Sequence, residues 1–285
     1  MLLCTSALGV DVKGQSRLQA RFEGGEHQVI GDAAWKSLKD SQEIPSSIDD
    51  MLPIQGGKVK VSYGTIVGLA ADFFAAPEGP ISNIAGTNQQ AVEARQSRCN
   101  RAFQELNLNP DSAGEVKDIV PLFKSEMNSI NAMKGGKTLS YVDFNTKYAT
   151  ITKARFLLLA RVNYDHFNDI NPQTGKYSDV VLSYIACHQL AILIANDASK
   201  ESDADTKNKR LTQALEVNAF ADHFLTDLFS AGHLRTPRRA FDTVCTANLV
   251  TAGRLAKCMH DEVIMGVLVG LIVLSIKIKI KIKIK

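Results

Sequence analysis

An apolar stretch in the second half of the chain, YSDVVLSYIACHQLAILIAND (177–197), constrains the fold more than any other feature. Its side chains are apolar nearly all the way round a helix, which is typical of a helix that other elements cover on every side. Apolar residues also recur with a helical period over the next segment, 209–229. The sequence therefore predicts a helical bundle with residues 177–197 at its centre.

Helical patterns fill most of the remaining chain. They cover residues 27–40, 64–74, 88–106 and 143–162. Loops rich in Pro, Gly, Asn and Asp separate the helices at 76–90, 107–112, 168–176 and 197–206. The segment KVKVSY (58–63) alternates like a strand but is too short to predict a sheet. We therefore predict an all-α multi-helix bundle with one domain over residues 25–262, after an N-terminal extension over residues 1–24.

The composition fits a globular protein and argues against some functions. The 285 residues are 45% hydrophobic and 22% charged, which allows one sizeable core. The net charge of +3 does not indicate a broad nucleic-acid-binding surface. The five cysteines include no C-x-x-C pair, so we expect neither a cysteine zinc site nor a thiol redox motif, and cysteine usage does not settle the redox compartment.

Both ends of the chain differ from its middle. The start, MLLCTSALGVDVKG, has no basic n-region and is not a convincing signal peptide; we expect an incomplete N-terminus, with a shortened signal peptide as the alternative. Residues 263–276 give 14 mostly apolar residues, fewer than the ~20 of a spanning helix. They run into KIKIKIKIK (277–285), which has a strand period. We expect residues 263–285 to be a non-native or frame-shifted tail outside the domain, with a short membrane anchor as the alternative.

The segment ALEVNAFADHFLTDLFSAGHLRTPRR carries the most informative polar residues. His223 and Asp227 lie four residues apart, so on a helix they share one face and can bind one metal ion together. His233 follows six residues later, and Gly232 is a place where the helix can end and redirect the chain. Zinc accepts both imidazole nitrogen and carboxylate oxygen. The alternative is a helix that tolerates partly buried histidines, but burying three unpaired polar groups costs free energy.

Three further polar residues stand in apolar or loop contexts. They are His27 in GEHQVIGD, Asp72 in GLAADFFAAP and His166 in YDHFNDINPQTGKY. Asp72 has no basic neighbour in the sequence, which is unusual for an acid in an apolar helix. His188 lies inside the apolar segment YIACHQLAIL, and we expect it to be a hydrogen-bonded histidine rather than a metal ligand.

Taken in order, these motifs resemble those of the zinc-dependent phospholipase C family, whose superfamily includes the single-strand-specific zinc nucleases of fungi. The matching stretches are EHQVIGDAA, LAADFFAAP, DHFNDINPQTGKY and DHFLTDLFSAGH. The wording of SYGTIVGLAADFF and DHFLTDLFSAGHLR is closest to a bacterial branch that hydrolyses phosphatidylcholine. The likeness covers about residues 25–262 and rests on several separate motifs. It implies an all-α bundle with up to three zinc ions at the bottom of a cleft.

The resemblance also implies a role for each ligand. Asp72, His166 and His223 would hold one zinc ion. Asp227 would bridge this ion and a second one, which His27 would also bind. His233 and His260 would belong to the third zinc site. Asp72 would in addition orient or deprotonate the attacking water, and would therefore be the catalytic residue.

Two departures from the family pattern affect the zinc sites. Family members supply a ligand from an N-terminal tryptophan, but the single tryptophan here, Trp35, follows His27. The late acidic ligand should stand four residues after its histidine, yet Ile264 occupies that position after His260. Asp261 and Glu262 lie next to it instead. The third zinc site therefore lacks its expected acidic ligand at position 264.

The resemblance predicts a secreted, zinc-dependent phospholipase C that acts on phosphatidylcholine-like lipids at a membrane surface and releases diacylglycerol and a phosphorylated head group. A zinc-dependent single-strand nuclease is the alternative enzyme, although the small net charge argues against a stable nucleic-acid partner. An inactive metal- or membrane-binding member is the alternative of another class. The sequence does not determine head-group specificity or oligomeric state.

Two further groups of residues have both a functional and a structural interpretation. The candidates for apolar surface at the cleft mouth are Phe73, Phe74, Phe167, Phe224 and Phe229, although aromatic residues at helical spacing are more often plain core residues. The basic run RTPRR (235–239) suits phosphate or lipid head groups, but we expect a solvated loop instead.

Overall fold

The computed structural model describes residues 24–134, 144–245, 251–253, 255–256 and 259–260. It confirms the all-α class, with one small β-hairpin added. The elements are α1 (Gly24–Asp40), β1 (Met51–Ile54), β2 (Val59–Ser62), α2 (Tyr63–Leu69), α3 (Gln89–Leu108), α4 (Ser112–Lys134), α5 (Phe144–Ile151), α6 (Arg155–Ala160), η2 (Tyr164–His166), α7 (Asp179–Ser199), α8 (Ala204–Asp227), α9 (Ala231–Arg235) and α10 (Arg238–Val244). The predicted tail, 263–285, and the chain before residue 24 lie outside the described residues.

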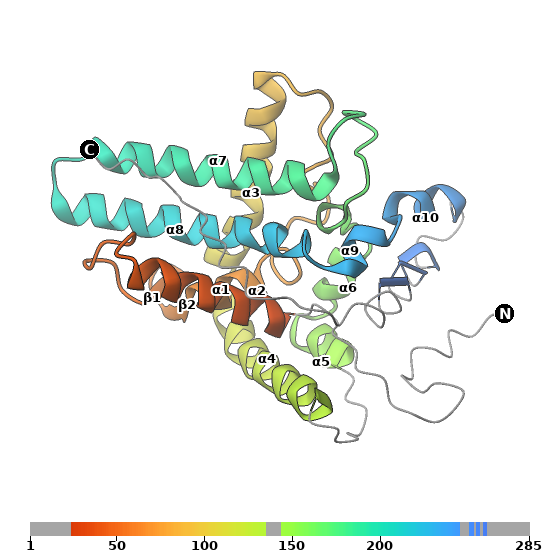
Figure 1. The fold of residues 1–285 in the computed structure, drawn as a ribbon, viewed down its shortest axis with the longest axis horizontal. Coiled ribbons are helices and arrows are strands. Elements are labelled where there is room, and N and C mark those ends of the chain that lie inside the picture. The colour runs from red at the N-terminus through yellow and green to blue at the C-terminus, as the bar shows by residue number, and fades with distance from the viewer. Residues whose placement is uncertain (1–23, 135–143, 246–250, 254, 257–258, 261–285) are drawn as a thin grey trace.

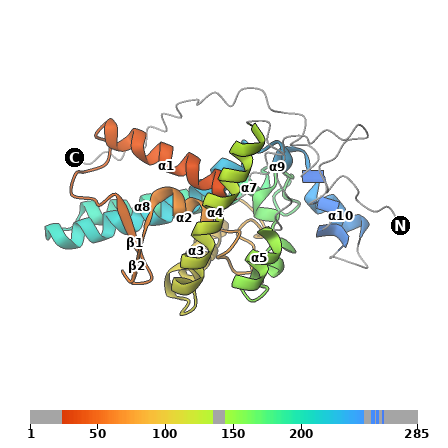
Figure 2. The same ribbon diagram turned by 90° about the horizontal axis from the view of Figure 1, so that it is seen from below.

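The helices α7 and α8 form a long antiparallel pair (Figure 1). Helix α3 crosses α7, and a disulfide between Cys99 and Cys187 joins the two helices. Helices α1 and α2 pack on the other side of α8, and α4 crosses beneath them (Figure 2). Helix α8 begins at a capping residue, Asp203, whose carboxylate accepts a hydrogen bond of 2.8 Å from the backbone N–H of Thr206. The core helices thus surround α8, which carries two of the predicted ligands.

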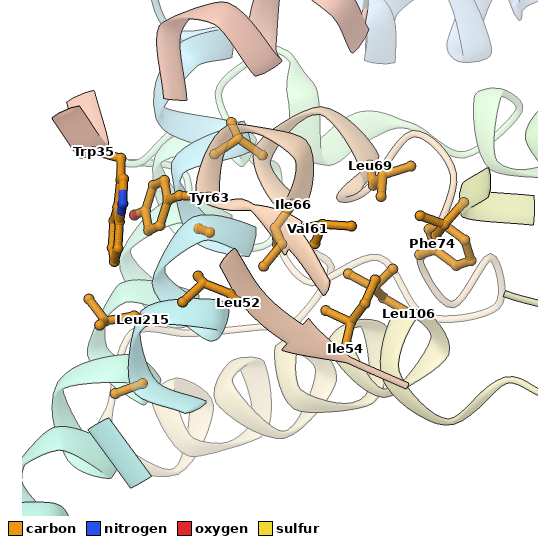
Figure 3. Packing of buried hydrophobic residues seen from close by; sticks show 14 of the residues in the cluster. Trp35, Leu52, Ile54, Val61, Tyr63, Ile66, Leu69, Phe74, Leu106 and Leu215 are labelled. Carbon is orange, nitrogen blue, oxygen red and sulfur yellow. The ribbon is translucent and has the colours of Figure 1, made fainter. Parts of the chain in front are cut away.

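The larger hydrophobic core lies between α1, the hairpin, α2 and α8. Trp35 stacks on Tyr63 with ring centroids 5.1 Å apart. Leu52 and Ile54 of β1 pack in the same core as Ile66 of α2 (Figure 3). A second core lies between α3, α7 and α8, where the rings of Phe103 and Phe220 meet edge to face. Together the two cores hold α8 from both sides.

Four local expectations from the sequence were incomplete or wrong. The predicted helix 64–74 ends at Leu69, because Ala71 has a positive φ of 53° that no α-helix contains. The predicted helix 143–162 is two short helices, broken where Lys153 and Ala154 both have positive φ. Residues 59–62 of KVKVSY form β2, which pairs antiparallel with β1. Helix α4 was not predicted, although it is one of the longest helices of the described chain.

Helix α7 is the one helix of the described chain that is long and apolar enough to cross a membrane. Length and composition alone support this, and 44% of its most apolar window is buried inside the protein. Its contacts with α8 and α3 account for its buried face, but Ile185, Ile192 and Leu193 are 40–49% exposed. The prediction that other elements cover this helix on every side was therefore wrong.

Candidate metal centre

Polar side chains from five separate segments meet at one end of α8. His27 comes from α1, Asp72 from the turn after α2, His166 from η2, His223 and Asp227 from α8, and His233 from α9. The histidines and Asp227 are buried, whereas the Asp72 side chain is 30% exposed. The structure therefore brings these six predicted ligands together in one cluster at this end of α8.

The carboxylate of Asp227 lies at the centre of this cluster. Its Oδ2 is 2.9 Å from His166 Nδ1 and 3.6 Å from His223 Nε2. Its Oδ1 is 3.0 Å from His233 Nδ1 and 3.5 Å from His27 Nε2. Four imidazole rings thus surround one fully buried carboxylate.

The ring nitrogen of His223 that faces this centre carries no proton. His223 Nδ1 lies 2.9 Å from the carbonyl oxygen of Val67, which can only accept, so Nδ1 is the protonated nitrogen and Nε2 presents its lone pair. That lone pair faces His166 Nδ1 at 3.1 Å. A histidine whose other ring nitrogen donates to a backbone carbonyl is the usual state of a metal ligand.

The distances and the unsatisfied atoms fit a metal ion. In a tetrahedral zinc site with bonds of 2.0–2.1 Å, two ligand atoms lie roughly 3.3–3.4 Å apart, close to the 3.5 and 3.6 Å from Asp227 to His27 and His223. Asp227 Oδ1 and His233 Nδ1 are buried and have no hydrogen-bond partner of acceptable geometry, although they lie 3.0 Å from each other. A cation between such atoms would satisfy both, whereas leaving them unpaired costs free energy.

Two overlapping groups of residues could each hold an ion. In each group the ligand atoms all lie within 4.8 Å of one another. The groups are His27, Asp72 and His223, and His166, His223 and Asp227. His223 belongs to both groups, whereas Asp227 belongs to one of them. The carboxylate of Asp227 nevertheless lies near His27 of the first group as well as His166 of the second.

The protonation states at neutral pH are those of a ligand set. Burial lowers the pKa of His27 and of His233 to about 4, although the charge of Asp227 opposes the shift. Burial also holds the pKa of His223 well below its ordinary value. The pKa of Asp227 stays well below its usual range, because the surrounding histidines outweigh the effect of burial. Metal binding requires neutral imidazoles and ionised carboxylates, which these groups supply.

His166 is the exception among the four histidines. Burial acts to lower its pKa, but the charge and hydrogen bond of Asp227 and the charge of Asp72 outweigh burial and raise the pKa to about 9. His166 therefore carries the positive charge of the cluster when no metal ion is bound. A metal ion would displace this proton, since a cation and an imidazolium compete for the same carboxylates.

Asp165 positions His166 and was not singled out in the sequence. Its carboxylate accepts hydrogen bonds from the backbone N–H groups of Ile81 (2.7 Å) and Ser82 (2.8 Å) and from Ser183 Oγ (2.9 Å). It thereby ties the loop after α2 and helix α7 to η2. One indication of this role was present in the sequence, namely that Asp165 directly precedes the predicted ligand His166. That position alone does not distinguish an acid that positions a ligand from an acid on the surface.

His260 packs against the cluster next to His233. The two rings have centroids 4.6 Å apart, and His260 is buried. A Cβ atom at Gly232 would lie 2.3 Å from Cδ2 of His260, so glycine is required there for close approach. The interpretation of Gly232 as the end of the helix was wrong: α8 ends at Asp227, and Gly232 lies inside α9. Residues 261–264 lie outside the described residues, so the late acidic ligand stays a prediction.

His188 belongs to a different hydrogen-bonded network. Its Nδ1 lies 2.7 Å from Asn218 Oδ1, and its ring stacks on Tyr184. Asn218 in turn donates to the hydroxyl oxygen of Tyr63, which donates to Asp222. The structure thus places His188 in neither of the two candidate ligand groups.

The basic run RTPRR (235–239) is only partly the solvated segment that its sequence predicts, because Arg235 at the end of α9 is exposed but Arg238 and Arg239 are not. Arg238 is fully buried and donates to Asn163, Asp242 and the carbonyl oxygen of Arg161. Arg239 pairs with Asp179. Both guanidinium groups therefore hold α10 on the bundle and are not available to a phosphate group.

Four of the five aromatic candidates for a cleft mouth are core residues. Phe73, Phe74, Phe167 and Phe224 are at most 3% exposed, whereas Phe229 is 47% exposed.

A cavity of about 30 Å³ adjoins His166, and its lining is mostly apolar. The lining residues include Ala71, Ala75, Pro77, Ile81, Leu159 and Phe220. The cavity has room for a group the size of a water molecule or two beside the cluster.

Comparisons with protein-family models, with curated proteins and with solved structures give no match to this chain. The class of the protein is therefore given by its fold and its candidate site alone. It is an all-α protein whose described residues form a buried imidazole–carboxylate cluster that could hold a metal ion.

Proposed function

We propose that this protein is a zinc-dependent phosphodiester hydrolase of the phospholipase C type. The observation that carries the proposal is Asp227, a fully buried carboxylate within 3.6 Å of ring nitrogens of four histidines. Imidazole and carboxylate ligands suit zinc, and clustered zinc ions neutralise a phosphodiester and lower the pKa of a bound water toward ~7. The order of the motifs along the chain supports the same family.

Asp72 is the proposed catalytic residue. It is the partly exposed carboxylate of a cluster whose other members are buried, and its Oδ1 lies 3.9 Å from His166 Nε2. An acid in this position can accept a proton from a water molecule that approaches from solvent. Asp72 lies in the turn after α2, directly after Ala71 with its positive φ.

A lipid substrate is favoured over nucleic acid. A strand of nucleic acid requires a basic track beside the site. In the basic run RTPRR, Arg238 and Arg239 pair with Asp242 and Asp179, so only Arg235 is exposed, and the net charge is only +3. The disulfide between Cys99 and Cys187 supports the proposed secreted location, since disulfides persist in oxidising compartments.

The test is a metal analysis combined with two hydrolysis assays. We expect the purified protein to contain at least two zinc ions per chain and to release phosphocholine from phosphatidylcholine vesicles. The Asp72→Asn variant should bind zinc more weakly, because Asp72 belongs to a candidate ligand group. In excess zinc it should still lose at least about 100-fold in kcat, the usual effect of removing a general base. Cleavage of single-stranded DNA in preference to vesicles would favour the nuclease. Bound zinc with neither activity would favour the inactive, binding member.

A further inference from the structure

Thr226 connects α8 to His27 of α1 inside the candidate metal centre. Its side chain is buried, and Oγ1 lies 2.6 Å from His27 Nδ1. The same oxygen is 2.7 Å from the carbonyl oxygen of His223 and 3.0 Å from that of Asp222. The hydroxyl therefore has three polar neighbours, two of which are carbonyl oxygens.

Counting hydrogens determines the direction of these bonds. A threonine hydroxyl has one hydrogen, and a carbonyl oxygen can only accept. If the hydroxyl donated to His27, both carbonyl oxygens would face its lone pairs without a hydrogen between them. The hydroxyl must therefore donate to a carbonyl of α8 and accept from His27 Nδ1–H. In this tautomer His27 Nε2 has no proton, and its lone pair faces Asp227 Oδ1 at 3.5 Å.

His27 and His223 are oriented in two different ways. A backbone carbonyl, that of Val67, determines the tautomer of His223. A side-chain hydroxyl does so for His27, whose ring also stacks on that of His223 with centroids 4.3 Å apart. Substitution can remove a hydroxyl but not a backbone carbonyl, so the effect of orienting His27 can be measured.

We propose that Thr226 is a positioning residue that holds His27 in the Nδ1-protonated tautomer, with Nε2 turned toward the metal position. The proposal rests on the proposed metal function of the cluster. Groups that orient a ligand histidine in this way commonly contribute about 10- to 100-fold to metal affinity. Because Thr226 lies on the helix that carries His223 and Asp227, it also joins α1 to the part of α8 that supplies these two ligands.

The test compares Thr226→Val, which keeps the shape but lacks the hydroxyl, with Thr226→Ser, which keeps the hydroxyl. Zinc affinity is measured by competition with a chromophoric chelator. We expect the valine variant to bind zinc about 10- to 100-fold more weakly at the site that includes His27, and the serine variant to remain within a few-fold of the parent. Thr152→Val is the matched control, because Thr152 is equally buried and its hydroxyl donates to the carbonyl of Tyr148, outside the cluster.

A second measurement does not depend on metal or activity. Nitrogen-15 NMR of the metal-free parent reports which ring nitrogen of His27 is protonated; we expect Nδ1, and a mixture of tautomers in Thr226→Val. An Nε2-protonated His27 in the parent, or equal zinc affinity in the parent and the valine variant, would overturn the proposal. An equal loss in the serine and valine variants would overturn it too, because packing would then explain the effect. If the parent binds no zinc, the proposed function fails, and the NMR result alone decides the role of Thr226.

Discussion

Asp227 is a buried carboxylate that lies within 3.6 Å of ring nitrogens of four buried histidines. Replacing it by asparagine keeps the volume but removes the negative charge that a cation needs. We expect Asp227→Asn to retain less than half of the metal of the parent after dialysis, measured by elemental analysis, with the helical circular dichroism preserved. Unchanged metal content would contradict the assignment of Asp227 as a shared ligand.

His188 provides the matched control for this experiment. It is a histidine on the neighbouring helix α7 and hydrogen-bonds to Asn218 rather than to a residue of the cluster. We expect His188→Gln to keep its metal and some activity while packing or ligand orientation is weakened. Complete loss of zinc with an intact fold would mean that our interpretation of His188 is wrong.

Gly232 shows how closely the cluster is packed. An added Cβ would lie 2.3 Å from His260, so Gly232→Ala must displace that ring or move α9. We expect a loss of about 1–3 kcal/mol in the free energy of unfolding, the usual cost of overpacking, measured by urea denaturation. Gly114→Ala is the control, because a Cβ there meets no atom within 4 Å and alanine favours a helix. Equal effects of the two substitutions would exclude a packing constraint at Gly232.

At the scale of elements, the disulfide between Cys99 and Cys187 joins α3 to α7 across a separation of 88 residues. Closing so long a loop restricts the unfolded chain, so we expect the double substitution to alanine to lower the free energy of unfolding by about 2–4 kcal/mol. Urea denaturation with and without a reducing agent provides the measurement. The reductant should destabilise the parent and leave the double variant unchanged. A parent that is insensitive to the reductant would show that this bond contributes nothing.

Helix α8 carries a buried acid, Glu216, that makes stability depend on pH. Burial raises its pKa from the ordinary 4.5 to about 8. The folded protein therefore holds a proton that the unfolded chain releases, so its contribution to stability is complete below pH 4.5 and is lost as the pH rises to 8. We expect the parent to lose on the order of 1 kcal/mol per pH unit over this window relative to Glu216→Gln, measured by urea denaturation. The exposed Glu93→Gln serves as the control, and parallel pH profiles of the parent and Glu216→Gln would contradict the prediction.

The element scale also shows what could be predicted from the sequence. Helical periods identified α1, α3, α7 and α8, because each buries one continuous face or more. The end of α2 could not be predicted, since it depends on a positive φ at Ala71 that no residue type there signals. Helix α4 was missed because it contains Pro121 and many polar residues, and packing against α1 supports it. Tertiary contacts, rather than local preference, determine these elements.

The residues of the cluster could be predicted better than the groups that orient them. The spacing of His223 and Asp227 is sufficient to place both on one face of a helix, because four residues make about one helical turn. The groups that support them, Asp165, Thr226 and the carbonyl of Val67, come from segments distant in the chain or carry no distinctive pattern. Their roles arise only when α1, α2 and α8 pack together, so a single sequence does not reveal them.

At the scale of the whole molecule, the cluster joins five segments, from His27 of α1 to His233 of α9. A metal ion bound there stabilises the folded state alone, since the unfolded chain does not hold these ligands together. We expect a chelator to lower the Tm of the parent and added zinc to restore it. At a free zinc concentration roughly 1,000 times the Kd the stabilisation is about 4 kcal/mol. Differential scanning fluorimetry measures the shift, and Asp227→Asn should show little of it. If the chelator leaves the parent Tm unchanged, the buried charges must be balanced by the His166 proton and Asp227 alone, and the cluster would then be a structural ion pair rather than a metal centre.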